Sequence, residues 1–259
     1  MHDAGEQIAD YMVAPVRSVR GRTSLREVSQ LLTTHGLSAL PVVDGDQRII
    51  GVISLTDLIR LGSIRPGDVA GQSVLEIPED PVALAMTPDP LTVPPTLTVP
   101  RAARLLLRRR IHRVFVTKDE RLLGVLAMRD LLRVVAARGS TEPISDYMND
   151  LAVTMPATAS IPDAISRLET SQLHTIVVMR HGKPVGTFTQ DEAVTARHTF
   201  ERGQVEDVMN TSFLCLPTDT PMQRAAQQAV LMKSSLLIAL HAGQVAGVLS
   251  PTDFAFAAM

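Results

Sequence analysis

Apolar residues follow a helical period near the start of the chain and then gather into short continuous runs. The 3.6-residue period predicts a helix over residues 25–35. Ser24 followed three residues later by Glu27 forms a capping-box pattern, so we expect the helix to begin there. Gly36 is placed to end it, because glycine readily adopts the left-handed conformation found after helix ends.

The next segment has the pattern of a hairpin followed by a helix. Residues 39–43 and 49–54 are apolar runs rich in β-branched residues, and Asp44-Gly45-Asp46 between them is typical of a turn. Nearly every residue of each run is apolar, which predicts strands buried on both faces. With a short strand over 16–20 and a second helix over 56–61, the unit is strand, helix, strand, strand, helix.

This unit occurs four times, so function must reside within the repeats or between them. Each copy has a glycine, a short apolar strand and an acidic residue, in the segments Gly51 to Asp57, Gly124 to Asp130, Gly186 to Glu192 and Gly247 to Asp253. We expect helix N-caps at Thr98, Ser160 and Thr220 in the later copies. The connection 62–84 is rich in glycine and proline and is interpreted as a loop with one short helix, and 136–145 as a boundary between two pairs of repeats.

Composition narrows the class of protein. The 259 residues are 45% hydrophobic, enough for packed cores, and the formal charge of −2 gives no global signal for acidic partners. Residues 1–10 lack the apolar stretch of a signal peptide and no apolar run reaches the length of a membrane helix, so we expect a cytoplasmic protein without membrane contact. Cys215, the single cysteine, has no disulfide or zinc partner and is interpreted as a small buried residue on a strand. No metal site is expected.

The repeated motifs resemble those of the cystathionine-β-synthase (CBS) domain family. The opening Asp10-x-Met12, the strand and turn Leu40-Pro41-Val42-Val43-Asp44, and Gly51 through Asp57 carry the likeness, and all four copies lie in register. The resemblance covers about residues 11–258 and implies an α/β (α+β) fold of four β-α-β-β-α repeats, paired into two pseudo-twofold Bateman modules. The modules would span residues 1–140, with repeats at about 11–61 and 85–136, and residues 141–259, with repeats at about 147–197 and 208–258.

The resemblance also implies a ligand: AMP, ADP, ATP or S-adenosylmethionine, bound in clefts between paired repeats. In the family the acid at the start of the last helix holds ribose and nearby hydroxyls contact phosphate. Capping of the helix would by itself explain the same residues, and the two roles are compatible. Intact sets occur in the first and fourth copies, at Ser54, Thr56, Asp57, Ser250, Thr252 and Asp253.

The two middle copies depart from this pattern. The second keeps Asp130 but has Ala127 in place of the hydroxyl residue and Arg129 beside the acid, a charged donor that could replace the hydroxyl. The third keeps Thr189 but has Asp191 and then Glu192, and two adjacent acids would repel a phosphate. We therefore rank the first and fourth sites highest and expect the third to be empty or altered.

Two further features concern phosphate. Ile111-His112-Arg113 resembles a segment of the γ subunit of the AMP-activated kinase, which makes His112 and Arg113 candidates for phosphate contact; His174 is a weaker counterpart in the third copy. Arginines crowd the segment around the first helix of the second copy, at Arg101, Arg104, Arg108, Arg109, Arg110 and Arg113. They form either a solvated face or an anion-binding surface. Aromatic residues make up only 3% of the chain, which argues against RNA binding by base stacking.

These observations predict a stand-alone regulatory protein that is not an enzyme. It would bind an adenosine-containing ligand and transmit the binding to a regulated partner, and we expect a homodimer. A scaffold protein without ligand is the alternative, and a nucleic-acid binder using the Arg101–Arg113 segment is the third.

Overall fold

The structure is a computed structural model that describes residues 5–66, 73–171, 175–199, 203–234 and 236–259. It divides into two compact units. One contains residues 7–97 and 113–126, and the other contains residues 1–6, 98–112 and 127–259. The division runs through the second repeat, whose strands belong to the first of these units and whose helices belong to the second.

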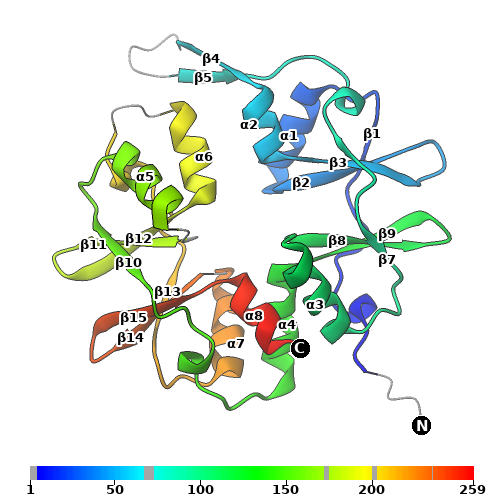
Figure 1. Cartoon of the computed structure of the whole chain (residues 1–259). Helices are drawn as coiled ribbons and strands as arrows, with labels where there is room; N and C mark the ends of the chain where they lie inside the picture. The colour runs from blue at the N-terminus through cyan, green and yellow to red at the C-terminus, as the bar shows by residue number, and fades with distance from the viewer. Residues whose placement is uncertain (1–4, 67–72, 172–174, 200–202, 235) are drawn as a thin grey trace. The chain divides into compact units, whose positions relative to one another are not determined.

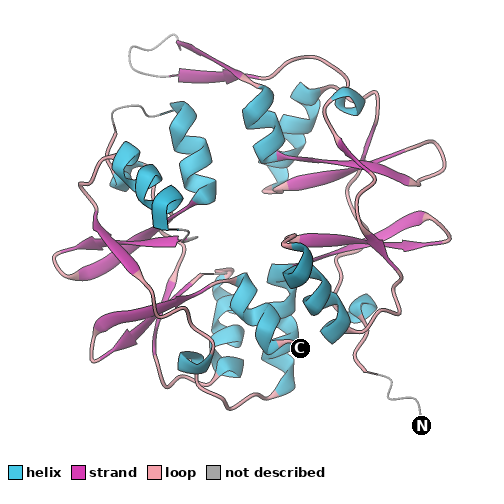
Figure 2. Cartoon of the chain, in the orientation of Figure 1, coloured by secondary structure: helices cyan, strands magenta, loops and turns pink. Residues whose placement is uncertain are grey.

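The first repeat follows the predicted element order. Its sheet joins β1 (Val19–Arg20), β2 (Ala39–Val43) and β3 (Ile49–Ser54), with β1 parallel and β3 antiparallel to β2. Two helices, α1 (Leu25–His35) and α2 (Leu55–Leu61), pack on one side of it (Figure 2). The bounds of α1 and of both hairpin strands match the sequence prediction. Ser24 Oγ accepts the Glu27 N–H, and Gly36 ends α1 at a φ of 59°.

The other repeats keep this plan (Figure 1). The second has strands β7 (Thr92–Val93), β8 (Arg113–Lys118) and β9 (Arg121–Ala127) with helices α3 (Val99–Arg109) and α4 (Leu131–Arg138). The third has β10 (Val153–Pro156), β11 (Thr175–Arg180), β12 (Lys183–Thr189), α5 (Ile161–Ser171) and α6 (Gln190–Thr199). The fourth has β13 (Leu214–Pro217), β14 (Leu237–His241), β15 (Gln244–Leu249), α7 (Met222–Met232) and α8 (Pro251–Ala257). Short 3-10 turns open the repeats at Ile8–Asp10, Val82–Leu84, Ile144–Asp146 and Val205–Asp207, and a further one, η3 (Met128–Asp130), precedes α4.

The opening segment of each repeat pairs with a strand in the sheet of another repeat. β6 (Thr87–Pro88), which opens the second repeat, pairs with β3 of the first, and Val13 pairs with Val125 in return. The third and fourth repeats exchange in the same way, through Asn149 with Val248 and Asn210 with Thr187. A methionine beside each exchanged residue lies against a glycine of the receiving strand, so the methionine that opens each repeat meets the glycine of the neighbouring repeat. The contacts join Met86 to Gly51, Met12 to Gly124, Met209 to Gly186 and Met148 to Gly247.

The continuous hydrophobic runs of the sequence form strands that are buried against another sheet on one face and against helices on the other. Val177 of β11, Ile238 of β14 and Val248 of β15 form a buried cluster between the third and fourth repeats. The opposite face of β11 turns Ile176 and Val178 toward α5, where they join a second core with Leu168. β11 is therefore buried on both faces, as predicted, whereas the hairpin's return strand alternates between buried and half-buried positions in the first repeat.

Three sequence predictions are corrected. The connection 62–84 is not only loop and helix: it contains a hairpin of β4 (Ser63–Pro66) and β5 (Ser73–Glu76). Cys215 lies on strand β13 but is exposed, because that strand alternates in burial and its inward position is taken by Leu216. The N-cap of α7 is Pro221 instead of Thr220. No described helix is long and apolar enough to cross a membrane.

Candidate functional site

In the first repeat, Ser54 and Asp57 form a complete capping box at the start of α2. Ser54 Oγ accepts the Asp57 N–H over 3.2 Å, while Asp57 Oδ2 accepts from the Ser54 N–H over 3.0 Å and from the Ser54 hydroxyl over 2.5 Å. The other oxygen, Asp57 Oδ1, accepts from the guanidinium of Arg60. The capping role predicted from the sequence is thus present, and the carboxylate is held at the point where the free N–H groups of the helix emerge.

Arg113 lies beside this helix start. Its guanidinium nitrogen Nη2 donates to Ser38 Oγ over 2.8 Å, and the carbonyl oxygen of Ser38 accepts the Leu55 N–H over 3.0 Å. Leu55 is the first residue of α2, so Ser38 bonds to Arg113 through its hydroxyl and to the helix N-terminus through its carbonyl oxygen. Thr56, the second residue of α2, is exposed there. The structure therefore brings four predicted residues of two repeats into one region: Ser54, Thr56, Asp57 and Arg113.

Ser38 was not among the predicted site residues. It occupies the position in the first repeat that His112 occupies in the second, immediately before the first hairpin strand. The carbonyl of His112 likewise accepts a hydrogen bond from the start of the following turn, through the Met128 N–H over 2.9 Å. Aligning the repeats would have placed Ser38 opposite His112, but a serine at the start of a strand has many possible roles.

In the other unit, the candidate residues of the second and fourth repeats lie together. Thr252 Oγ1 is 3.9 Å from Met128 Sδ, so the start of α8 contacts η3. η3 also contains Arg129, which is exposed, and Asp130, which is buried. The carboxylate of Asp130 accepts the Ala127 N–H over 2.7 Å and pairs with Arg133 over 3.6 Å.

In the fourth repeat the aspartate accepts the same two hydrogen bonds from its serine as in the first, without an arginine three residues later. Asp253 Oδ2 accepts from the Ser250 N–H over 2.7 Å and from the Ser250 hydroxyl over 2.9 Å. Burial raises the pKa of Asp253 above its usual value, and the hydrogen bonds from Ser250 oppose that rise. Phe256 stands where the first repeat has Arg60.

In the third repeat, Glu192 caps the start of the last helix in place of the shorter aspartate. Glu192 Oε2 accepts from the Thr189 N–H over 2.9 Å and from the Thr189 hydroxyl over 2.5 Å. Glu192 therefore takes the structural place of the aspartate, and Asp191 is a second acidic residue in the first turn of α6. His174 lies outside the described residues.

The arginines of α3 lie on its solvent side. Ala102, Ala103 and Leu106 are buried, whereas Arg101, Arg104 and Arg108 are exposed. Arg109 and Arg110 at the end of the helix are also exposed. In the parts of the chain that the structure describes, no group of His, Cys, Asp and Glu could hold a metal ion.

Solved structures share the fold over nearly the whole chain. Protein MJ1225 of Methanocaldococcus jannaschii matches 97% of this chain and 99% of its own length, with a TM-score of 0.74 and 14% identity. A conserved protein of Pyrococcus horikoshii matches 98% of this chain and 100% of its own, with a TM-score of 0.67 and 15% identity. These likenesses confirm the predicted α/β fold of four repeats.

Sequence relatives match shorter stretches. A 33.4 kDa protein in a ribosomal RNA operon of Thermofilum pendens is 28% identical over 187 residues, which are 67% of this chain and 59% of that protein. Inosine-5'-monophosphate dehydrogenase of Halobacterium salinarum is 33% identical over 110 residues, but these make up only 20% of the enzyme. The chain thus spans less than two thirds of the length of these relatives.

The CBS domain itself matches four times, at residues 8–63, 81–137, 144–199 and 205–259. These ranges coincide with the four repeats and include every candidate residue named above. The chain therefore belongs to the CBS domain family and carries four copies of the domain.

Proposed function

We propose that this protein is a regulatory sensor that binds an adenosine-containing nucleotide between paired CBS repeats and transmits the binding to a partner protein. The ligand class is AMP, ADP, ATP or S-adenosylmethionine. The paired repeats are the two modules expected from the sequence, residues 1–140 and 141–259. The reciprocal exchange of opening segments supports this pairing, because it joins the first repeat to the second and the third to the fourth.

The observation that carries the proposal is the position of Arg113 beside the start of α2. A helix N-terminus offers free N–H groups and a partial positive charge to a phosphate, and a guanidinium adds a charge-assisted donor. Ser38 holds that guanidinium next to Leu55, while the Asp57 carboxylate lies at the same helix end. A donor set for phosphate and an acceptor for ribose hydroxyls therefore occur within one small region.

The Arg60 guanidinium would have to yield one oxygen of Asp57 to such a ligand. Arg60 is 73% exposed, and exposed ion pairs contribute only about 0–1 kcal/mol. Displacing it would therefore cost little against the hydrogen bonds that two ribose hydroxyls offer. The capping bonds between Ser54 and Asp57 would stay in place when the ligand binds, because they use the other oxygen of the carboxylate, Asp57 Oδ2.

A second proposed site lies between two repeats that do not form a pair. Arg129 of the second repeat would supply the phosphate contact next to Thr252 of the fourth, and His112 lies at the same turn through its bond to Met128. Coupling to a partner requires that the ligand bind two states of the protein unequally. The regulated partner and a homodimeric assembly are carried over from the family resemblance alone. The proposed role is regulatory, and the dehydrogenase activity of the partial relative is not transferred to this chain.

Calorimetric titration with AMP, ADP, ATP and S-adenosylmethionine tests the proposal. At least one ligand should bind saturably and, at 100 times its dissociation constant, stabilise the fold by about 2.7 kcal/mol. Asp57→Ala and Arg113→Gln should weaken binding at the first site, and Asp253→Ala and Arg129→Gln at the second. Asp219→Ala, an exposed acid of the fourth repeat away from both helix starts, is the control. Absence of binding by all four compounds to folded, ligand-free protein would refute the sensor role.

One observation favours the scaffold alternative. All the acids at these helix starts already act as caps, and in the first repeat both Asp57 oxygens accept hydrogen bonds. If the carboxylates served the fold only, Asp57→Ala would lower stability by about 0.5–2 kcal/mol, as loss of a cap does, without changing any nucleotide affinity.

A further inference from the structure

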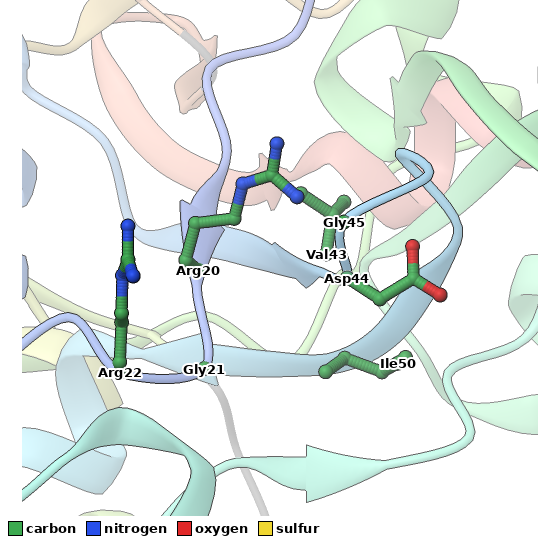
Figure 3. A pocket seen from close by; sticks show the side chains of 7 residues that line it. All are labelled: Arg20, Gly21, Arg22, Val43, Asp44, Gly45 and Ile50. Carbon is green, nitrogen blue, oxygen red and sulfur yellow. The ribbon is translucent and has the colours of Figure 1, made fainter.

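A hollow of about 460 Å³ lies in the first repeat, away from the helix starts described above. It is lined by Arg20, Gly21, Arg22, Val43, Asp44, Gly45 and Ile50. Figure 3 shows the side chains of Arg20 and Arg22 rising from one strand end, with Asp44 on the other side and Ile50 below. Volumes of about 300–1,000 Å³ are typical of small-molecule sites.

The hollow is separate from the proposed nucleotide site of the same repeat. Ile50 lies near the beginning of β3 and Ser54 at its end. Four residues of extended strand span about 13 Å, so the two places are at opposite ends of the sheet. A ligand in the hollow would not occupy the start of α2.

Comparison among the four repeats shows that the arginines are particular to the first. The strand registers pair Val19 with Val42, Val93 with Val116, Met155 with Val178 and Leu216 with Ala239, which aligns the repeats residue by residue. At the position of Arg20 the other repeats have Pro94, Pro156 and Pro217. At the position of Arg22 they have Thr96, Thr158 and Asp219. The fold does not need a cation at either position, since three repeats form the same sheet without one.

The two guanidinium groups also lack an internal role. Among the described residues, neither the Arg20 nor the Arg22 guanidinium makes an ion pair or a hydrogen bond, whereas Arg26 and Arg48 nearby are paired with Glu79 and Glu120. Asp44 forms no ion pair with either of them, and its Oδ1 accepts the Asp46 and Arg48 N–H groups of the hairpin turn over 2.9 Å each. Two unpaired cations thus border one concave surface.

We propose that this hollow is a second ligand site, which binds a phosphate monoester of a small hydroxylated molecule. The guanidinium groups of Arg20 and Arg22 would contact the phosphate oxygens, for which arginine has a matching fork of donors. Asp44 Oδ2 would accept a hydrogen bond from a hydroxyl of the ligand, and Ile50 would contact the carbon skeleton of the ligand. The proposal is independent of nucleotide binding at the helix starts.

The test is calorimetric titration of the full chain with glycerol 3-phosphate and with inorganic phosphate at constant ionic strength. Saturable binding is expected for glycerol 3-phosphate and weaker binding for inorganic phosphate, which lacks the carbon skeleton. Arg20→Gln combined with Arg22→Thr should weaken glycerol 3-phosphate binding at least tenfold without changing the thermal unfolding midpoint. Arg224→Gln, an exposed arginine of the fourth repeat, is the matched control and should bind as the parent does.

Two results would overturn the assignment: no saturable binding of glycerol 3-phosphate, or binding that the double variant retains in full. Different variants test this proposal and the nucleotide proposal, so the failure of one can be told from the failure of the other. Asp57→Ala and Asp253→Ala should leave glycerol 3-phosphate binding unchanged, and the arginine variant should leave nucleotide affinity unchanged. Loss of both bindings in the arginine variant would show that the ligand reaches the helix starts and would refute a separate site.

Discussion

The carbonyl oxygen of Asn149 lies 2.7 Å from the position that a Cβ atom on Gly247 would occupy. The two strands are locked at this point, since the Asn149 N–H donates to the Val248 carbonyl over 2.9 Å and the Val248 N–H donates back over 3.0 Å. Only glycine permits so close an approach of one backbone to another. The glycine repeated in all four copies is therefore a packing requirement of the exchanged segments.

Gly247→Ala should lower the free energy of unfolding by about 1–3 kcal/mol, because overpacking forces the backbone or the Met148 side chain to shift. Urea denaturation followed by circular dichroism measures the change. Gly45→Ala is the control: a Cβ there meets nothing within 4 Å, and the substitution should be neutral or slightly stabilising. Equal effects of the two substitutions would contradict the packing explanation.

Asp253→Asn should make stability less sensitive to pH. Burial raises the pKa of Asp253 in the folded protein, so the folded state binds its proton more tightly than the unfolded state does. The stability that this group contributes is complete below its unfolded pKa, about 4, and is lost as the pH rises through the higher folded value. Asparagine keeps an oxygen acceptor for Ser250 but carries no charge.

The stability of Asp253→Asn relative to the parent should therefore increase between pH 4 and pH 7, as measured by thermal unfolding across that range. Asp219→Asn, which removes one carboxylate from an exposed position of the same repeat, is the matched control for the loss of a charge. A difference between Asp253→Asn and the parent that stays constant with pH would show that the carboxylate is not desolvated.

Replacing Arg101, Arg104 and Arg108 together by glutamine should change the free energy of unfolding by less than about 0.5 kcal/mol, since all three are exposed. Chemical denaturation checks this. The same variant tests the nucleic-acid interpretation: if α3 bound nucleic acid, the parent would show binding that weakens steeply with salt, and the variant would show a shallower salt dependence. We expect neither.

Cys215 should react with a thiol reagent in the folded protein, because its side chain is exposed on β13. Partial burial nevertheless raises the pKa of its thiol, which lowers the fraction of reactive thiolate at neutral pH. The rate of reaction with a disulfide reagent should be slower than that of free cysteine at pH 7 and should increase with pH. Reaction only after denaturation would contradict the exposure of this strand position.

Much of the local structure is predictable from single repeats. The helix over 25–35 and the strands over 39–43 and 49–54 have the predicted bounds, because helical period, capping residues and turn residues act over short distances. The hairpin of β4 and β5 was missed because glycine and proline dominate that connection and each strand has only one β-branched residue, Ile64 in β4 and Val74 in β5. The exposure of Cys215 was missed because a run such as Leu214 to Leu216 does not show which of its alternating faces is covered.

The candidate site shows the same division. The sequence identified Ser54 and Asp57, since a hydroxyl followed three residues later by an acid marks a helix start. It did not identify Ser38, whose hydroxyl holds Arg113 beside the first residue of α2. That contact joins residues of two different repeats, and no local pattern encodes it.

The sequence by itself determined the repeat, the order of elements within it and the family, because each depends on short-range spacing that occurs four times. Only the tertiary structure decided which motifs meet. It placed Met86 against Gly51 and Arg113 against Ser38, and it left Arg20 and Arg22 unpaired around a hollow. Such contacts depend on how distant strands pack and pair, and packing is decided by the whole fold through steric fit and burial.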